Sequence, residues 1–387
     1  MKKFLDCISI VGATPSKFHG TKKYVSTGAV ATTEIDESEV VEVTYEDRPS
    51  RANLSAEAGD ILFAKMQGTR KTLLLDSETE ENIYSTGFYA VRANPEVITT
   101  ECLYYLIDSE LFLAQKDKNC SGATQKAITN GGMAKIEISV PALSEQGILV
   151  NKLKHLTQLI ADKKKQLNLF DEIIKSRFIE MFGTLSSNEQ NFEVLTIESL
   201  CSLIKDGTHQ TPTYTEDTIN GFKFLSSKDV MSTKINWGDI KYIPSDLHEK
   251  LYAVVKPIKN DILMSKNGVN YGVAAVNDTD EVFDIYVSLA LLRPKTDIIN
   301  PVYFRSAINS PDTKRQFDSS IKGIGVPNLH LGEIKKTKIL VPPVDKQNEY
   351  VSFVEQVDKS KFYIVQMQIL LRLLTRAIQQ KTTEVLL

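Results

Sequence analysis

The sequence of 387 residues has few cysteines and no long apolar run. Its four cysteines are scattered and none forms a CxxC pair, which argues against structural zinc and against a disulfide framework. No apolar stretch approaches the roughly 18 residues of a membrane-spanning helix. The early acid Asp6 argues against a secretory leader. We therefore expect a protein of the reducing cytoplasm.

Motifs that would carry catalysis are also missing. The sequence contains no GxxxxGK[ST] pattern, no glycine-rich loop opening a βαβ unit, and no Asn/Asp-Pro-Pro-aromatic tetrapeptide of the amino-methyltransferase kind. The nearest tetrapeptide, 341–344, lacks both end residues. His209 has no histidine at ligand spacing, so we interpret it as a contact or loop-structuring residue. We predict a chain whose chemistry resides in other subunits.

The charge balance argues against a generally basic nucleic-acid binder. The formal net charge is −3, whereas such proteins usually carry a basic domain. Any binding to nucleic acid must therefore depend on local basic loops.

What the sequence does contain is a repeat with a constant offset of 201 residues, as between Asp60 and Asp261. Residues 58–65 match 259–266, and residues 135–141 with Gln146 match 336–342 with Gln347. Arg92 and Arg293 are separated by the same offset. Several matches in one register indicate a duplicated module. The residues that the two copies share are mainly apolar residues, glycines and prolines, whereas the polar residues of the loops differ between the copies. This difference favours two sites that do the same kind of job on different targets.

Each copy is followed by apolar residues at alternating spacings of four and three, the pattern of a long packed helix. The first helix is expected to begin near Ser144 and to end at Gly183, and the second to begin near Asp345. A pseudo-two-fold axis between the copies would pair the helices antiparallel. The alternative is two core helices, each covering its own domain. The predicted helix–helix packing residues are Leu149, Leu153, Leu156, Ile160, Leu167, Ile174, Ile364, Leu371, Leu374 and Ile378.

The predicted fold class is α+β, with two globular mixed α/β domains, each followed by a long helix, and the two helices forming an antiparallel coiled coil. The predicted boundaries are 1–145 and 185–345 for the domains, and 146–184 and 346–387 for the helices. Further helices are expected over 100–114 and 301–308. The strand candidates are 40–44, 60–64, 87–92, 136–140, 239–243, 261–265, 288–293 and 338–341.

Polar, glycine-hinged loops stand at equivalent places in both copies. Lysine and arginine neutralise phosphates, while Arg, Lys, Asn and Gln read base edges in the major groove. The candidate DNA contacts are Thr14, Ser16, Lys17, His19, Lys22, Lys23, Lys65, Gln67, Thr69, Arg70, Lys71, Gln125, Lys126, Lys205, Thr208, His209, Gln210, Lys266, Asn267, Asn270, Tyr271 and Lys322.

Taken with the two-domain, two-helix order, two Thr-Pro segments carry a resemblance to a known family. Gly-Ala-Thr-Pro-Ser at 12–16, Asp-Gly-Thr-His-Gln-Thr-Pro at 206–212 and the Asp-Ile-Leu strands make the chain similar to the specificity subunit of type I restriction–modification systems. The resemblance covers essentially the whole chain. It departs at Ala13, where a second glycine is commoner, and in the weaker heptad of the second helix.

The resemblance implies a non-catalytic subunit in which each globular part is a target recognition domain that reads one half of a bipartite, asymmetric DNA site. The helices would space the domains and dock two methyltransferase (modification) subunits, with restriction or translocase subunits as further partners. No cofactor is expected on this chain; S-adenosylmethionine, ATP and Mg would be bound by the partners.

Two other readings are open from the residues alone. One is a coiled-coil scaffold that binds proteins and lacks DNA specificity, which would show no salt-dependent DNA binding. The other is a hydrolase with a dispersed active site built from the scattered carboxylates.

Overall fold

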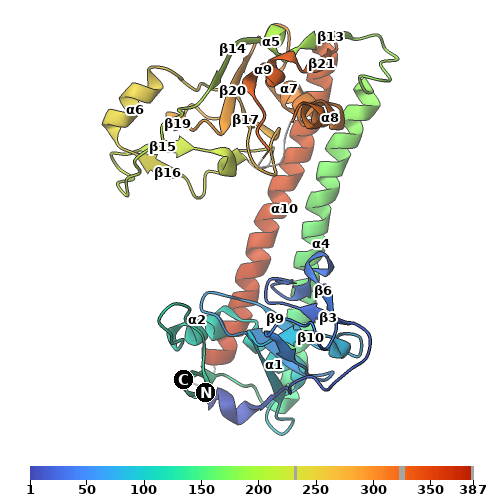
Figure 1. The fold of residues 1–387 in the computed structure, drawn as a ribbon, viewed down its shortest axis with the longest axis vertical. Helices are drawn as coiled ribbons and strands as arrows, with labels where there is room; N and C mark the ends of the chain where they lie inside the picture. Colours follow the sequence, from blue (N-terminus) through green and yellow to red (C-terminus); the bar gives the residue numbers. More distant parts are fainter. Residues whose placement is uncertain (231–232, 322–326, 385–387) are drawn as a thin grey trace. The chain divides into compact units, whose positions relative to one another are not determined.

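The computed structural model describes residues 1–230, 233–321 and 327–384, and for 380–384 the backbone alone (Figure 1). The chain divides into two compact units. Unit 1 comprises Met1–Lys165 and the residues from Ile364 on, and unit 2 comprises Gln166–Tyr363. Each unit holds one globular part together with a portion of each long helix. The four consecutive segments predicted from the sequence remain a prediction.

Unit 1 is built on two four-stranded sheets. In the first, the order β2-β11-β8-β9 is antiparallel throughout. Asp60 of the Asp-Ile-Leu motif directly precedes β8, and all four residues of β8 are buried. In the second, the order is β6-β3-β10-β7, and β3 and β10 run parallel. The strands are β1 (Lys2–Lys3), β2 (Ile8–Val11), β3 (Lys22–Val25), β4 (Val30–Ala31), β5 (Glu34–Ile35), β6 (Val41–Val43), β7 (Ala52–Leu54), β8 (Ile61–Ala64), β9 (Thr72–Leu74), β10 (Ile83–Ser85), β11 (Phe88–Ala93) and β12 (Glu137–Ile138).

Unit 2 repeats this topology. Its main sheet has the antiparallel order β14-β20-β17-β18, and its second sheet has the order β16-β15-β19 with β15 and β19 parallel. The pair β13–β21 corresponds to the pair β1–β12 of unit 1. All eight strand candidates coincide with strands. The strands are β13 (Glu193–Thr196), β14 (Cys201–Asp206), β15 (Phe222–Leu225), β16 (Lys241–Ile243), β17 (Ile262–Ser265), β18 (Ala274–Val276), β19 (Phe283–Ile285), β20 (Leu289–Pro294) and β21 (Lys338–Val341).

Short helices cover the main sheets. The helix predicted over 301–308 is confirmed, but the single helix predicted over 100–114 is wrong, because Ser109 divides it. Its hydroxyl donates to the Leu106 carbonyl at 2.6 Å and accepts from the Phe112 amide at 3.2 Å, which caps a second helix. The helices are α1 (Thr100–Ile107), α2 (Glu110–Lys118), α3 (Asn130–Met133), α5 (Ile197–Leu200), α6 (Ser245–Tyr252), α7 (Pro301–Ile308), α8 (Pro311–Ser320) and α9 (Leu331–Lys336).

Two long helices, α4 (Leu143–Phe182) and α10 (Val344–Glu384), begin with the same anchor. Gln146 and Gln347 are fully buried. The Gln146 side chain accepts from the Thr99 amide at 2.7 Å and donates to two backbone carbonyls, and Gln347 does the same with the Asn300 amide at 2.8 Å. Each helix is thereby fixed to the domain that precedes it. Among the described residues, no helix combines the length and the apolar composition needed to cross a bilayer.

Within unit 2 the two long helices run side by side and antiparallel (Figure 1). Lys361 Nζ lies 2.5 Å from Asp171, whereas Arg177, further along α4, lies 3.7 Å from Glu349, further back along α10. In unit 1, Ile378 of α10 packs against the core that contains Leu149 of α4. The antiparallel pairing predicted from the repeat is confirmed within each unit's own portion of the helices.

The packing residues predicted on α4 are buried or half-buried at every position. On α10, the predicted packing residues Ile364, Leu371 and Ile378 are half-buried. The prediction that Leu374 packs against the other helix is wrong, because its side chain is 47% exposed. The half-buried stripe instead passes through the polar residues Gln368 and Thr375. The alternation of three and four therefore has the opposite phase on this helix, and Leu374 falls on the outer face. The predicted packing residues on α4 are Leu149, Leu153, Leu156, Ile160, Leu167 and Ile174.

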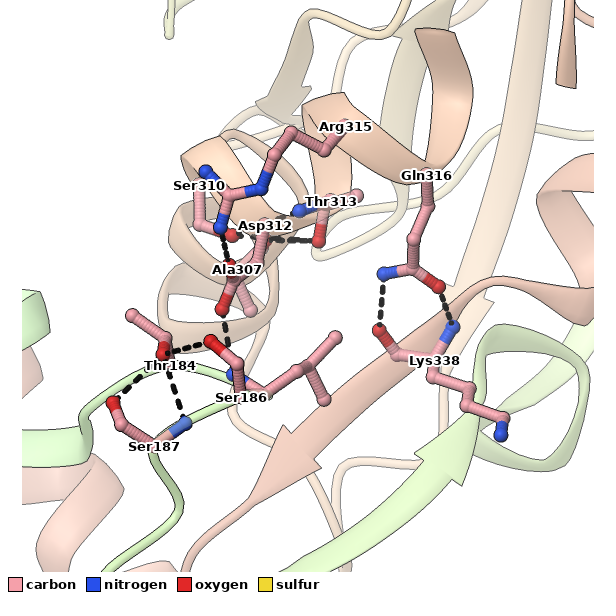
Figure 2. A network of polar contacts seen from close by, with 11 residues as sticks. Thr184, Ser186, Ser187, Ala307, Ser310, Asp312, Thr313, Arg315, Gln316 and Lys338 are labelled. Atoms are coloured by element: carbon pink, nitrogen blue, oxygen red, sulfur yellow. Dashed lines mark hydrogen bonds and ion pairs between the residues drawn. The ribbon is translucent and has the colours of Figure 1, made fainter. Parts of the chain in front are cut away.

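A polar network fixes the point where the chain leaves α4 (Figure 2). Gly183 ends the helix, as predicted, with φ +71°. The next turn is held because the Leu185 amide donates to Asp312 Oδ2 at 2.6 Å, and Arg315 pairs with the same carboxylate. Gln316 of α8 then binds the Lys338 backbone at 2.9 and 3.0 Å (Figure 2). Helix α8 thus joins the α4 exit to strand β21.

Candidate nucleic-acid interface

In unit 1 the loop between β8 and β9 lies against the glycine segment 121–127. The Ile128 amide donates to the Lys65 carbonyl at 2.9 Å, and the Gln67 amide donates to the Lys126 carbonyl at 2.9 Å. Two candidate segments that are far apart in the sequence are therefore neighbours. We call the exposed part of residues 65–71 and 121–127 surface 1.

Unit 2 repeats this contact with the same offset. The Leu329 amide donates to the Lys266 carbonyl at 2.8 Å, and the Gly268 amide donates to the Pro327 carbonyl at 3.1 Å. The loop after β17 is thus placed like the loop after β8. Lys322, a candidate contact, lies outside the described residues.

A third segment joins this loop in unit 2. Lys266 Nζ lies 2.6 Å from Asp206 Oδ1, at the end of β14, and Thr208 forms a backbone bridge with Tyr286. His209 and Gln210 follow, both exposed. We call the exposed part of residues 205–210 and 267–271 surface 2. Among the described residues, no group of His, Cys, Asp and Glu is arranged to hold a metal ion.

The candidate Lys266 is wrong as a DNA contact. Its side chain is 7% exposed, and its ammonium is held by the Asp206 carboxylate. Removing a paired charge from such a site would leave the carboxylate uncompensated. Lys266 therefore stabilises surface 2 by linking the loop after β17 to the end of β14 through its ion pair with Asp206.

Sequence reasoning missed Lys116, which does a similar task in unit 1. Its side chain is 2% exposed, and its Nζ donates to the carbonyls of Ala64, Met66 and Thr69 at 3.2, 2.9 and 2.7 Å. Burial lowers the pKa of Lys116. The only sequence signal is its place on α2, four residues after the buried Phe112. Lys116 shapes the loop 65–71 through its backbone.

Three predicted cations of surface 1 have internal partners. Arg70 pairs with Asp108 through Nε and Nη2 at 3.0 and 2.8 Å, and this pairing raises the pKa of Arg70. Lys71 Nζ donates to the Thr27 carbonyl at 2.5 Å, and Lys65 Nζ lies 4.3 Å from the centre of the Tyr89 ring. Burial lowers the pKa of Lys65.

The remaining residues of surface 1 divide by exposure. Gln67, Gln125 and Lys126 face solvent, although the Gln67 amide group also donates to the Asp117 carbonyl at 3.2 Å. Thr69 is half-buried. Gln125 and Lys126 are therefore the side chains best placed to contact a ligand.

In surface 2 the loop residues are more enclosed. Tyr271 donates its hydroxyl to Asp318, and Lys314 Nζ lies 3.4 Å from the centre of its ring. Asn267 and Asn270 are half-buried, and the Asn267 side-chain oxygen has no partner among the described residues. Lys205 is exposed and donates to the Val254 carbonyl at 3.1 Å.

The remaining candidates of unit 1 belong to the first Thr-Pro loop and to strand β3. Thr14, Ser16 and His19 are exposed. Lys17, Lys22 and Lys23 lie 3.6, 3.0 and 2.8 Å from Glu46, Glu81 and Glu37, and β3 of the second sheet carries the latter two lysines. Exposed pairs of this kind contribute little stability and exchange readily for phosphate.

Comparison with known proteins agrees with this architecture. Residues 10–169 and 189–374 match the family model described as type I restriction modification DNA specificity domain. The type I restriction enzyme EcoBI specificity subunit of Escherichia coli is 23% identical over 270 residues, covering 64% of this chain and 56% of that protein. The EcoKI specificity subunit of Escherichia coli strain K12 is 23% identical over 319 residues, covering 77% and 67%.

A solved chain has a similar fold. Its structure is described as the basis of complex assembly and conformational transition of the type I R-M system; the TM-score is 0.58 at 20% identity, with 97% of each chain covered. The chain spans a little over half the length of the EcoBI subunit that it matches. Because the family model covers both globular parts and most of both long helices, the chain belongs to the type I restriction modification DNA specificity domain family.

Proposed function

We propose that this chain is a non-catalytic subunit that reads DNA sequence, each globular part reading one half of a bipartite, asymmetric site. The observation that carries the proposal is that the two units share the same backbone contacts around the candidate loops but expose different side chains there. The backbone places Gln125 and Lys126 on surface 1, and His209 and Gln210 on surface 2. Glutamine pairs with adenine and lysine with guanine or phosphate, so different sets select different half-sites.

We further propose that α4 and α10 dock two methyltransferase subunits. Support comes from apolar side chains that these helices leave exposed: Ile173, Phe362 and Tyr363 in unit 2, and Leu370 and Leu373 in unit 1. Large exposed apolar residues gathered on a helix are typical of protein interfaces. On this proposal S-adenosylmethionine, ATP and Mg are bound by partner subunits, restriction subunits join where they are present, and the complex works in the cytoplasm.

The test is selection from randomised duplex DNA with the full chain and its methyltransferase subunit. The expected result is enrichment of one bipartite sequence. Gln125→Ala with Lys126→Ala should relax one half-site only, and His209→Ala with Gln210→Ala the other. Gln356→Ala with Lys359→Ala, exposed on α10, is the control and should leave the selected sequence unchanged.

Salt dependence separates this proposal from the protein-binding scaffold. Each phosphate contact that is lost should reduce the slope of log K against log salt by about 0.9. Selection without any sequence preference, or binding that does not weaken with salt, would contradict DNA reading by this chain.

A further inference from the structure

A cavity of about 240 Å³ lies in unit 2 where α4, α7, the start of α8 and α10 meet. Its apolar walls include Ile174, Phe178, Pro311 and Tyr350. This cavity is separate from surface 2, since none of the residues 205–210 or 267–271 lines it. Charged groups also line it: Arg305, Lys175 and Lys361, with Asp171 and Asp358.

Arg305 is the unusual member of this set. Its side chain comes from α7, and the residue is only 7% exposed. One nitrogen, Nη2, donates to Ser306 Oγ at 3.3 Å, whereas Nε has no partner among the described residues. Burial lowers the pKa of this guanidinium. An enclosed charge without a direct ion-pair partner is costly, and an anion in contact with it would offset that cost.

The two carboxylates of the cavity are engaged elsewhere. Asp171 lies 2.5 Å from Lys361 Nζ. Asp358 lies 3.5 Å from Lys234 Nζ and 3.9 Å from Lys361 Nζ. Neither forms an ion pair with Arg305 in the part of the chain that the structure describes. Asp358 and Asp171 act on Arg305 only through longer-range attraction, which favours its charged form, so the guanidinium lacks a directly contacting carboxylate.

The duplicated domain shows that the scaffold does not require an arginine here. Helices α1 and α7 begin 201 residues apart, at Thr100 and Pro301, so Tyr104 and Tyr105 are the equivalents of Arg305 and Ser306. Their ring centres are 5.2 Å apart. The second copy replaces two aromatic rings by an arginine and a serine, which leaves space beside a cation.

We infer that this cavity is a binding site for a small organic anion. The carboxylate or phosphate of the ligand pairs with the Arg305 guanidinium, whose planar fork suits both groups. The apolar part of the ligand lies against Phe178 and Pro311. The site is independent of DNA reading, so the two proposals can fail separately.

The test measures thermal unfolding and calorimetric binding of the full chain with four probes at constant ionic strength: phenyl phosphate, benzoate, inorganic phosphate and neutral phenol. At a concentration of about ten times Kd, phenyl phosphate or benzoate should raise the Tm by about 2–4 °C. Phenol should produce no shift, because it lacks the charge. No shift with any of the three anions would overturn the inference.

Two variants identify the site. Arg305→Met keeps most of the side-chain volume and should weaken anion binding at least tenfold. Arg305→Tyr with Ser306→Tyr installs the residues of the first copy, which pack in that setting, and should abolish binding. Arg372→Met, an exposed arginine of α10 in unit 1, is the matched control. Equal anion-induced shifts in the wild type and the double variant would also refute the site.

Discussion

Arg293 of β20 forms a two-point ion pair with Asp261, the residue before β17. Its Nε lies 2.8 Å from Oδ1 and its Nη2 lies 2.8 Å from Oδ2. The first domain contains the same pair between Arg92 and Asp60, at 2.6 and 3.1 Å. These pairings raise the pKa of both arginines. The residues that revealed the repeat therefore contact each other in each copy.

Asp261→Ala should destabilise the protein by about 3 kcal/mol. The aspartate is 1% exposed and also accepts from the Ile258 amide at 2.9 Å, so its loss leaves two donors without a partner. Denaturant unfolding of the full chain measures the change. Asp278→Ala, an exposed aspartate nearby, should alter stability by less than about 0.5 kcal/mol. Equal losses in the two variants would show that the buried pair has no special role.

Gly207→Ala should destabilise unit 2 by at least about 2 kcal/mol and displace surface 2. A Cβ at this position would lie 2.1 Å from the Ile285 carbonyl oxygen, and a backbone atom cannot easily move away. Gly147 in α4 is the matched control, since a Cβ there meets nothing within 4 Å. Gly147→Ala should therefore stabilise the helix by about 0.5–1 kcal/mol. Thermal unfolding of both variants checks the opposite signs.

Lys116→Met should loosen the loop 65–71 without unfolding unit 1. Three backbone carbonyls would lose the Lys116 ammonium as a donor, although the Met66 carbonyl would keep the Thr69 amide at 3.3 Å; we expect a cost of about 1–3 kcal/mol. Hydrogen exchange of the amides in this loop should accelerate. Lys118→Met removes an exposed lysine of the same helix and should leave their exchange unchanged. Unchanged exchange in Lys116→Met would mean that the hairpin holds the loop by itself.

Cys102 and Cys201 should resist thiol reagents at pH 8 in the folded protein. Burial raises the pKa of both thiols to about 12 from an ordinary value of 9.0. Because the folded state keeps these protons longer than the unfolded chain, the contribution of each thiol to stability is complete below pH 9 and is lost as the pH rises toward 12.

Counting reactive thiols in buffer and in urea tests this expectation: all four cysteines should react in urea. Rapid reaction of Cys201 in buffer would show that its burial is transient. Denaturation curves measured between pH 9 and 12 should show falling stability.

A feature of this molecule was predictable from the sequence when it depends on residues that are close together along the chain. The offset of 201 residues located the Asp-Ile-Leu strands, and the apolar period located α4 together with its end at Gly183. These features depend on neighbouring residues, because strand alternation, helix period and glycine termination act over a few positions.

The tertiary structure alone decided which polar side chains are free. Lys266 and Lys126 look equally suited to DNA in the sequence, yet one is held beneath its loop by Asp206 and the other faces solvent. Leu374 faces outward although its spacing fits the seam. In each case the outcome depends on residues brought close from distant segments. Local sequence patterns were enough to locate the repeated strands and helices. Long-range packing set which of their charged side chains are exposed, because a buried ammonium is costly unless it has a partner inside the protein.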